Sequence, residues 1–167
     1  MSAKLQESKD NGAHAMLGKL VGEWEGMAKT WFEPDKVADE SPSRGTIKLI
    51  LNGSYALYEY KGSFGGKPLE GMAIIGYHLD LRKFECAWVD SFHTGSAIIF
   101  SEGKRNENDI KVTGQYAYVT PDAEQYWGWR TEIAIVSDNE IVFTAFNISP
   151  EGEEQKATEL RYNRVGE

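Results

Sequence analysis

The sequence has few of the residues that form disulfides or metal sites, and it has no long apolar segment. Its 167 residues include one cysteine, Cys86, and three histidines. One cysteine forms no intrachain disulfide, which suits a reducing compartment such as the cytoplasm. The longest aliphatic and aromatic run is residues 97–100, whereas a membrane helix needs about 18 apolar residues.

Positive charge is also scarce. The chain carries 18 Lys and Arg against 26 Asp and Glu, a formal net charge of -8. This balance repels phosphate backbones and anionic lipid, so we expect neither nucleic acid nor a membrane as partner. The first residues, MSAKLQESKDNG, contain no apolar run and are predicted to be neither a secretory signal nor an anchor. The expectation is a cytoplasmic protein.

Aromatic residues and glycine are abundant, and their distribution divides the chain into a short start and one long domain. Aromatic residues make up 12% of the chain and there are 17 glycines. Residues 1–10 are polar and without period, which predicts a flexible tail. Residues 11–21 place Ala13, Met16, Leu17, Leu20 and Val21 on one helical face, which predicts a short amphipathic helix.

From residue 22 onward, β-branched and aromatic residues alternate with polar ones between good turn formers. Ten strands are predicted, at about 22–33, 44–52, 54–62, 68–78, 83–91, 96–102, 109–118, 126–136, 140–148 and 156–164. Only residues 34–43 are long and acidic enough for a real loop. Short connections and an even number of strands predict a closed up-and-down antiparallel barrel, so residues 11–167 form a single all-β domain with the helix as its plug.

The meander sorts residues to the two ends of the barrel. The far ends of the odd-numbered strands collect an aromatic and polar set: Trp31, Phe32, Tyr58, Tyr60, Asp90, Phe92, His93, Tyr116, Tyr118, Tyr126, Trp127, Trp129 and Arg130. An aromatic mouth opposite a plugged end is what a ligand-binding barrel needs. The predicted ligand-binding residues are Trp88, Asp90, His93, Tyr116, Trp127, Trp129 and Arg130. Each aromatic among them is also open to interpretation as ordinary packing.

Three polar residues at this mouth are candidates for catalysis. Asp90 can orient His93 as an acid-base pair, with Arg130 stabilising a developing anion. Alternatively, Asp90 accepts backbone N–H groups of the following turn and His93 is solvated. Arg130 lies on the strand face opposite Trp127 and Trp129, and the register with both tryptophans inward sends Arg130 to solvent.

Metal and thiol chemistry find little support. His78 and His93 fall at opposite ends of the barrel, about 25–30 Å apart at ~3.3 Å per residue, so they cannot share an ion. Cys86 shares a strand face with Phe84 and Trp88 and is interpreted as a small buried hydrophobe. We therefore expect no metal site and no cofactor.

Three resemblances accompany this interpretation. Gly22-Glu23-Trp24 resembles the Gly-x-Trp signature of lipocalins and other calycin barrels, in which an arginine of the last strand covers the tryptophan; here Arg161 or Arg164 is in place, and Trp24 with Arg161 is the predicted closure. The same residues resemble nitrobindin-type haem barrels, but no histidine lies between Thr94 and Glu167 to match their last-strand iron ligand.

The third resemblance covers most of the chain. The runs 44–46, 65–68, 87–93, 100–103 and 127–132 are similar to a bacterial domain-of-unknown-function family, number fifteen-seventy-nine, over about residues 11–164. It implies a lipocalin-like fold and no established activity, so function has to come from the site. Three hypotheses follow: a barrel that binds a small apolar or aromatic molecule, a small isomerase or hydrolase, and a filled barrel that acts as a structural or dimerisation module, with a homodimer possible.

Overall fold

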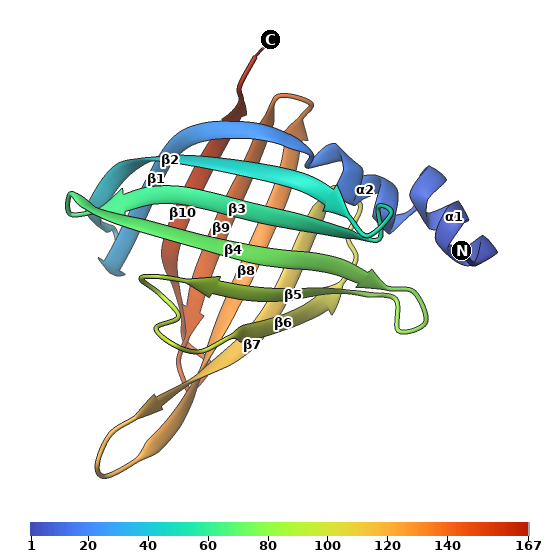
Figure 1. The fold of residues 1–167 in the computed structure, drawn as a ribbon. Helices are drawn as coiled ribbons and strands as arrows, with labels where there is room; N and C mark the ends of the chain where they lie inside the picture. The colour runs from blue at the N-terminus through green and yellow to red at the C-terminus, as the bar shows by residue number, and fades with distance from the viewer. Residues whose placement is uncertain (167) are drawn as a thin grey trace.

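The chain folds into a closed antiparallel barrel of ten strands, in a computed structural model that describes residues 1–166 (Figure 1). Each strand pairs with its sequence neighbours, and β1 pairs with β10 to close the barrel. The fold class is therefore the predicted one. The elements are α1 (Ala3–Asn11), α2 (Ala13–Lys19), β1 (Gly22–Glu33), β2 (Lys36–Ile50), β3 (Tyr55–Phe64), β4 (Lys67–His78), β5 (Lys83–Asp90), β6 (Ile99–Lys104), β7 (Asp109–Val119), β8 (Glu124–Ser137), β9 (Glu140–Ile148) and β10 (Glu154–Arg164).

The helix α2 covers one end of the barrel and completes its main core. Its residues Met16 and Leu17, with Leu20 just after it, are buried together with inward-facing strand residues such as Phe84 and Ile141. Burial of these apolar side chains stabilises the closed end. The opposite end is formed by the strand-to-strand turns, and there the β7–β8 hairpin extends beyond the barrel (Figure 1). Within residues 1–166, neither helix has the length and apolar character to cross a bilayer.

Barrel closure uses Arg164, so the prediction of Arg161 is wrong. Trp24 is 1% exposed and pairs across the β1–β10 seam with Arg164, whose guanidinium lies 4.3 Å from the centre of the indole ring. Arg164 Nε also donates to the carbonyl of Asp138 at 2.7 Å. Because side chains alternate along a strand, Arg161 faces outward, where it pairs with Glu140.

The start of the chain differs from the prediction. Residues 3–11 form the helix α1 instead of a flexible tail, and the helix predicted over 11–21 is confined to Ala13–Lys19. Local caps explain the first helix, since Ser2 Oγ accepts from the Leu5 N–H at 3.2 Å and Ser8 Oγ lies 2.8 Å from Nδ1 of buried His14. These side-chain bonds need no apolar period. A Cβ on Gly12 would come within 2.8 Å of Ser8 Cα, so the glycine permits the close approach of the two helices.

The acidic segment 34–43 also differs, because most of it belongs to β2 rather than to a loop. The chain turns at Asp35, with φ 60, and β2 runs back along β1 from Lys36. Inward positions on this stretch are occupied by the buried serines Ser41 and Ser43 instead of large apolar residues. Buried and exposed residues do alternate here, but the buried ones are serines, so a pattern based on hydrophobicity does not detect the strand.

Candidate functional site

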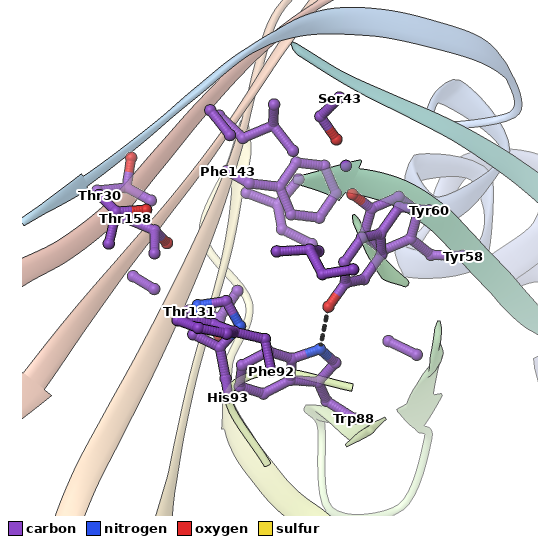
Figure 2. Close-up of a pocket in the computed structure, with 18 of the residues that line it drawn as sticks. Thr30, Ser43, Tyr58, Tyr60, Trp88, Phe92, His93, Thr131, Phe143 and Thr158 are labelled. Carbon is purple, nitrogen blue, oxygen red and sulfur yellow. Dashed lines mark hydrogen bonds between the residues drawn. The ribbon is translucent and has the colours of Figure 1, made fainter. Parts of the chain in front are cut away.

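A cavity of about 140 Å³ lies inside the barrel on the mouth side of the core (Figure 2). Its wall draws on β1 to β6 and β8 to β10 and on the loop that follows β5. The lining residues are Ala28, Thr30, Ser43, Tyr58, Tyr60, Gly62, Ser63, Phe64, Leu69, Ala73, Ile75, Cys86, Trp88, Phe92, His93, Ser101, Trp129, Thr131, Ile133, Phe143, Thr144, Ala145, Thr158 and Leu160. Within the described chain, this lining contains no Lys, Arg, Asp or Glu.

Stacked aromatic rings form the mouth end of the cavity. Trp88 of β5 and Trp129 of β8 lie with ring centres 5.3 Å apart and planes 24° apart. The imidazole of His93 is beside both, at 5.5 Å from Trp88 and 5.9 Å from Trp129. Offset stacking of this kind stabilises the pair beyond the area that it buries. Figure 2 shows Trp88, Phe92 and His93 together at one end of the cavity, with Phe143 and Ser43 toward the other.

A row of phenylalanines crosses the mouth itself. Phe64 lies 5.5 Å from Phe32 and 4.8 Å from Phe92, measured between ring centres. The three rings come from the ends of β1 and β3 and from the loop after β5, so they join turns that are distant in sequence. Phe32 is 64% exposed, and the row is therefore a partly solvated rim at the mouth of the cavity.

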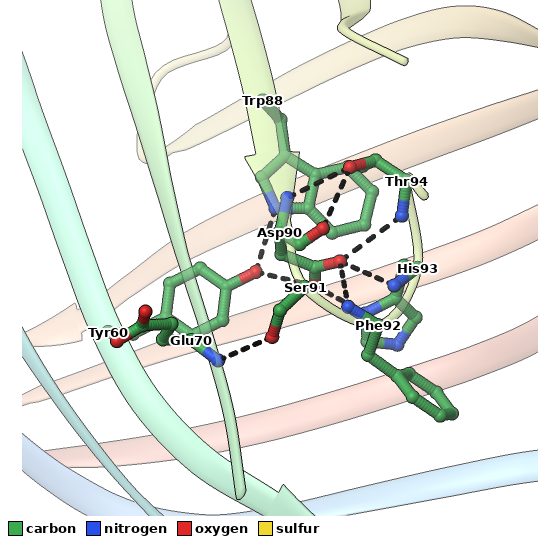
Figure 3. Close-up of polar contacts among 8 residues, drawn as sticks. All are labelled: Tyr60, Glu70, Trp88, Asp90, Ser91, Phe92, His93 and Thr94. Atoms are coloured by element: carbon green, nitrogen blue, oxygen red, sulfur yellow. Dashed lines mark hydrogen bonds and ion pairs between the residues drawn. The ribbon is translucent and has the colours of Figure 1, made fainter. Parts of the chain in front are cut away.

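Asp90 is the anchor of the loop that carries His93 (Figure 3). Its side chain is fully buried, and Oδ1 accepts from the backbone N–H groups of Phe92 at 3.0 Å, of His93, and of Thr94 at 3.2 Å. Oδ2 accepts from Tyr60 at 2.8 Å and lies 2.5 Å from His93 Nδ1. Asp90 therefore caps the turn and also orients the imidazole, which lines the cavity rather than lying in solvent.

A glycine makes the Tyr60 contact possible. Gly71 of β4 stands between Tyr60 of β3 and Asp90 of β5 in the strand register. A Cβ at this position would lie 2.3 Å from Tyr60 Oη and 2.5 Å from Asp90 Cβ. The missing side chain thus leaves room for a hydrogen bond that spans two strands which are not neighbours. Trp88 Nε1 donates to the same Tyr60 oxygen at 2.8 Å and extends the network to the cavity.

The network fixes protonation states. Burial raises the pKa of the Asp90 carboxyl, but the hydrogen bond and charge of His93 and the Tyr60 hydroxyl outweigh it and lower that pKa to about 2. Burial and the adjacent Asp90 charge raise the pKa of Tyr60. An ionised carboxylate only accepts, so His93 Nδ1 carries the proton that it shares with Asp90. Burial also raises the pKa of the Cys86 thiol to about 12, so no thiolate forms on the cavity wall near neutral pH.

Hydroxyl groups line the remaining walls. Thr30, Thr131 and Thr158 face the cavity from β1, β8 and β10 (Figure 2). Deeper in the barrel, Tyr58 Oη and Tyr162 Oη lie 2.8 Å apart, and Ser43 Oγ is 3.2 Å from Tyr162. Burial raises the pKa values of both tyrosines, which keeps these groups neutral. The cavity is therefore apolar, with neutral polar groups on its wall.

The predicted site residues divide into three groups. Trp88, His93 and Trp129 line the cavity, and Asp90 lies directly behind His93. Tyr116 instead donates to Asn147 at 2.7 Å, and Trp127 stands opposite Tyr116 in the β7–β8 pair without lining the cavity. Both lie in the β7–β8 pair, and Tyr116 packs against the buried cluster that contains Trp129.

Arg130 is also outside the cavity. It pairs with Glu154 through both terminal nitrogens and lies 4.5 Å from the centre of the Phe146 ring. From Trp129 onward β8 has the predicted inward face, because Trp129, Thr131 and Ile133 line the cavity from alternate positions, whereas Trp127 does not line it. Arg130 therefore faces outward and is not an anion partner for His93.

Several residues of the site were not singled out as ligand contacts. Tyr60 and Phe92 were sorted to the mouth but not to the site, and Phe143 and Thr158 were missed entirely. Alternation places Tyr60, Phe143 and Thr158 on inward faces, so for these three the signal was present in the strand pattern, whereas Phe92 lies in the loop after β5. Among residues 1–166, no group of three or more His, Cys, Asp or Glu side chains is arranged to hold a metal ion.

Fold and cavity together define a closed antiparallel barrel that encloses a small aromatic-lined chamber. The chain belongs to the family described as "Protein of unknown function (DUF1579)", whose model matches residues 9–164. This match confirms the family resemblance carried by the sequence runs. The sequence matches none of the curated proteins compared with it.

Two solved structures are similar in fold. The crystal structure of Rv2717c from M. tuberculosis has a TM-score of 0.60 and 12% identity, with 99% of each chain covered. A protein of unknown function from the DUF3598 family of Nostoc punctiforme has a TM-score of 0.42 and 15% identity, covering 89% of this chain and 48% of its own. At 12% identity, the likeness to Rv2717c concerns the fold alone.

Proposed function

We propose that the barrel binds a small apolar or aromatic molecule in the cavity behind its mouth. The observation that carries this proposal is the cavity of about 140 Å³ bounded by the stacked Trp88–Trp129 pair, whose lining contains no Lys, Arg, Asp or Glu. A cavity of roughly 150 Å³ is large enough for benzene. The volume therefore favours a molecule with one ring over a long-chain lipid or a porphyrin.

The architecture supports a lipocalin-like, calycin-type binding protein. The contact between Trp24 and Arg164 at the closed end is the arrangement that the Gly-x-Trp resemblance implies. Cys86 is a free, buried thiol, which supports the cytoplasm, a reducing compartment, as the proposed location. The net charge of -8 continues to argue against nucleic acid and anionic membrane as partners.

Titration with iodobenzene tests ligand binding. Iodine quenches indole emission at contact, so a molecule held between Trp88, Trp129 and Phe143 should quench tryptophan fluorescence saturably. The matched control is Trp127→Phe, which removes an indole that lies outside the cavity. It should leave the saturable part of the quenching unchanged, whereas the double substitution Trp88→Phe and Trp129→Phe should abolish it.

A cavity-filling variant provides an independent arm. Ala73 is 5% exposed and lines the cavity, so Ala73→Leu places three additional carbons in the volume that a ligand would occupy. Affinity should fall while the circular dichroism of the barrel is preserved. Linear, non-saturable quenching in the wild type, identical in Ala73→Leu, would remove the proposal.

A second candidate function is acid-base catalysis, and the bond between His93 Nδ1 and Asp90 Oδ2 at the cavity wall favours it. The oriented imidazole could act as a base toward a small substrate in a hydrolase or isomerase. Arg130 faces outward, so in this scheme neutral hydroxyl groups of the cavity wall would stabilise a developing anion, and they do so less well than a guanidinium. Hydrolysis of phenyl acetate tests it: a rate equal to that of buffer, unchanged in His93→Phe, excludes this hydrolase.

A homodimer also remains a proposal. Phe32, Tyr118, Val119 and Tyr126 are exposed apolar or aromatic residues at the mouth and on the β7–β8 hairpin. Isolated exposed apolar residues are common on monomers, so the observation is weaker than the cavity. Sedimentation equilibrium at micromolar concentration decides it, because a mass of one chain at all concentrations excludes the dimer.

A further inference from the structure

At the aromatic end of the cavity, the hydrogen-bond donors of Trp88 and Tyr60 are already paired within the protein. Trp88 donates its indole N–H to Tyr60, and Tyr60 donates its O–H to Asp90. Both donors are therefore occupied within the protein and are not offered to a ligand. A ligand that only accepts hydrogen bonds gains nothing from either group.

His93, in contrast, offers the ligand a hydrogen-bond acceptor. Its Nδ1 faces the carboxylate of Asp90, which holds the proton on that nitrogen. In the neutral imidazole the other nitrogen, Nε2, is then an acceptor. Among residues 1–166 no side chain or backbone group donates to Nε2, while the ring itself lines the cavity between Phe92 and the Trp88–Trp129 pair.

Size and charge limit the ligand further. The cavity of about 140 Å³ admits one aromatic ring. Its lining includes no Lys or Arg to pair with a carboxylate and no Asp or Glu to pair with an ammonium group. Burial of an unpaired charge is costly, so a charged ligand is disfavoured.

We propose that the ligand is a neutral single-ring aromatic molecule of the phenol class, whose hydroxyl donates to Nε2 of His93 while its ring packs against Trp88 and Trp129. This inference rests on the proposed binding function and names its ligand class. Asp90 acts as a positioning residue, since it sets the tautomer of His93 without touching the ligand. Tyr60 and Trp88 keep their own donors away from the ligand.

A double comparison of ligands and variants tests the hydrogen bond. The affinities of phenol and toluene, which are similar in shape, are measured for the wild type and for His93→Phe by displacement of iodobenzene. His93→Phe keeps a ring in place and removes the acceptor. Because the cost of desolvating phenol is common to both proteins, the phenol-to-toluene affinity ratio should be about tenfold larger in the wild type, as expected for one well-made hydrogen bond.

Tyr60→Phe is the complementary variant. It frees the Trp88 indole N–H by removing its acceptor. A ligand that accepts, such as benzaldehyde, should then gain several-fold in affinity relative to the wild type, whereas toluene should change little. An unchanged benzaldehyde affinity would mean that Trp88 does not direct its N–H toward the ligand.

Nitrogen-15 NMR of the wild-type imidazole provides a reading that does not depend on any variant folding. When the imidazole is neutral, Nε2 should resonate as the unprotonated nitrogen and shift when phenol, but not toluene, is added. Asp90→Asn should weaken this tautomer preference. A neutral imidazole that carries its proton on Nε2 in the wild type overturns the inference.

The outcomes separate the two proposals. If phenol and toluene both displace iodobenzene, and their affinity ratio is the same in the wild type and in His93→Phe, the binding function stands and the phenol inference falls. If neither displaces it and iodobenzene itself quenches without saturation, both fall together.

Discussion

Substitution of Asp90 by asparagine should destabilise the protein by an amount that shrinks as the pH falls. The pKa of this carboxyl is lowered from 3.8 to about 2 by its partners in the folded state. A lowered pKa adds stability that is fully present above the unfolded value and is lost as pH falls through the folded value. The difference of nearly 2 pKa units corresponds to about 2 kcal/mol of the free energy of unfolding at neutral pH.

The expected pH profile follows from these two values. About 1 kcal/mol should be lost between pH 6 and pH 3, and about 2 kcal/mol by pH 2. Urea unfolding monitored by circular dichroism at intervals from pH 6 to pH 3 measures the free energy of unfolding of both proteins. Asp90→Asn lacks the titrating group, so the gap between wild type and variant should narrow by about 1 kcal/mol over that range.

An exposed carboxylate provides the control. Asp122 lies in the turn between β7 and β8. Its replacement by asparagine makes the same chemical change at an exposed position and should alter the free energy of unfolding by less than about 0.5 kcal/mol. The reasoning about Asp90 is refuted if its gap stays constant from pH 6 to pH 3, because the carboxylate would then contribute no more to the folded state than to the unfolded chain.

Two further predictions concern stability and a third concerns the orientation of His93. Arg164→Leu should lower the free energy of unfolding by about 2 kcal/mol, because it removes the contact with the Trp24 ring and the hydrogen bond to the Asp138 carbonyl. Arg161→Leu removes only an exposed ion pair and should cost under about 1 kcal/mol. Equal losses in urea unfolding would contradict the assignment of Arg164 to barrel closure. Burial lowers the pKa of His14, so stability should decline as pH falls below 6.5, and His14→Gln should flatten that decline in thermal melts. Gly71→Ala should perturb the His93 imidazole resonances, while Gly18→Ala, which meets no atom within 4 Å, should not.

The pattern of strands and turns in the sequence was sufficient to predict the barrel and the residues that one strand, β8, contributes to the cavity wall. Alternation along β8 predicted that Trp129 faces inward and Arg130 outward, because a large aromatic side chain is more easily buried than an unpaired guanidinium. The boundaries of β9 matched the prediction because turn-forming residues flank its apolar segment, at 138–139 and 150–152. Sorting strand ends also brought Asp90 and His93 to the mouth.

What the sequence could not provide was the register between strands and the use of small polar residues. The bond between Tyr60 and Asp90 depends on how β3, β4 and β5 align, and no local period encodes that alignment. The first half of β2 was hidden because Ser41 and Ser43 fill inward positions usually held by apolar residues. The choice between Arg161 and Arg164 likewise required the β1–β10 register, which pairs Trp24 with the later arginine.

The gap left by Gly71 links assembly of the barrel to competence of the site. His93 is oriented by Asp90, Asp90 is held in part by Tyr60, and their contact passes over a strand that contributes no side chain there. A slip of one residue between β3 and β4 would place a side chain in that space and separate the two groups. A chain that misaligns these strands would therefore form a barrel with a disconnected imidazole. During refolding, ligand binding should therefore recover later than β-structure, and its recovery would report when β3 and β4 have reached the correct register.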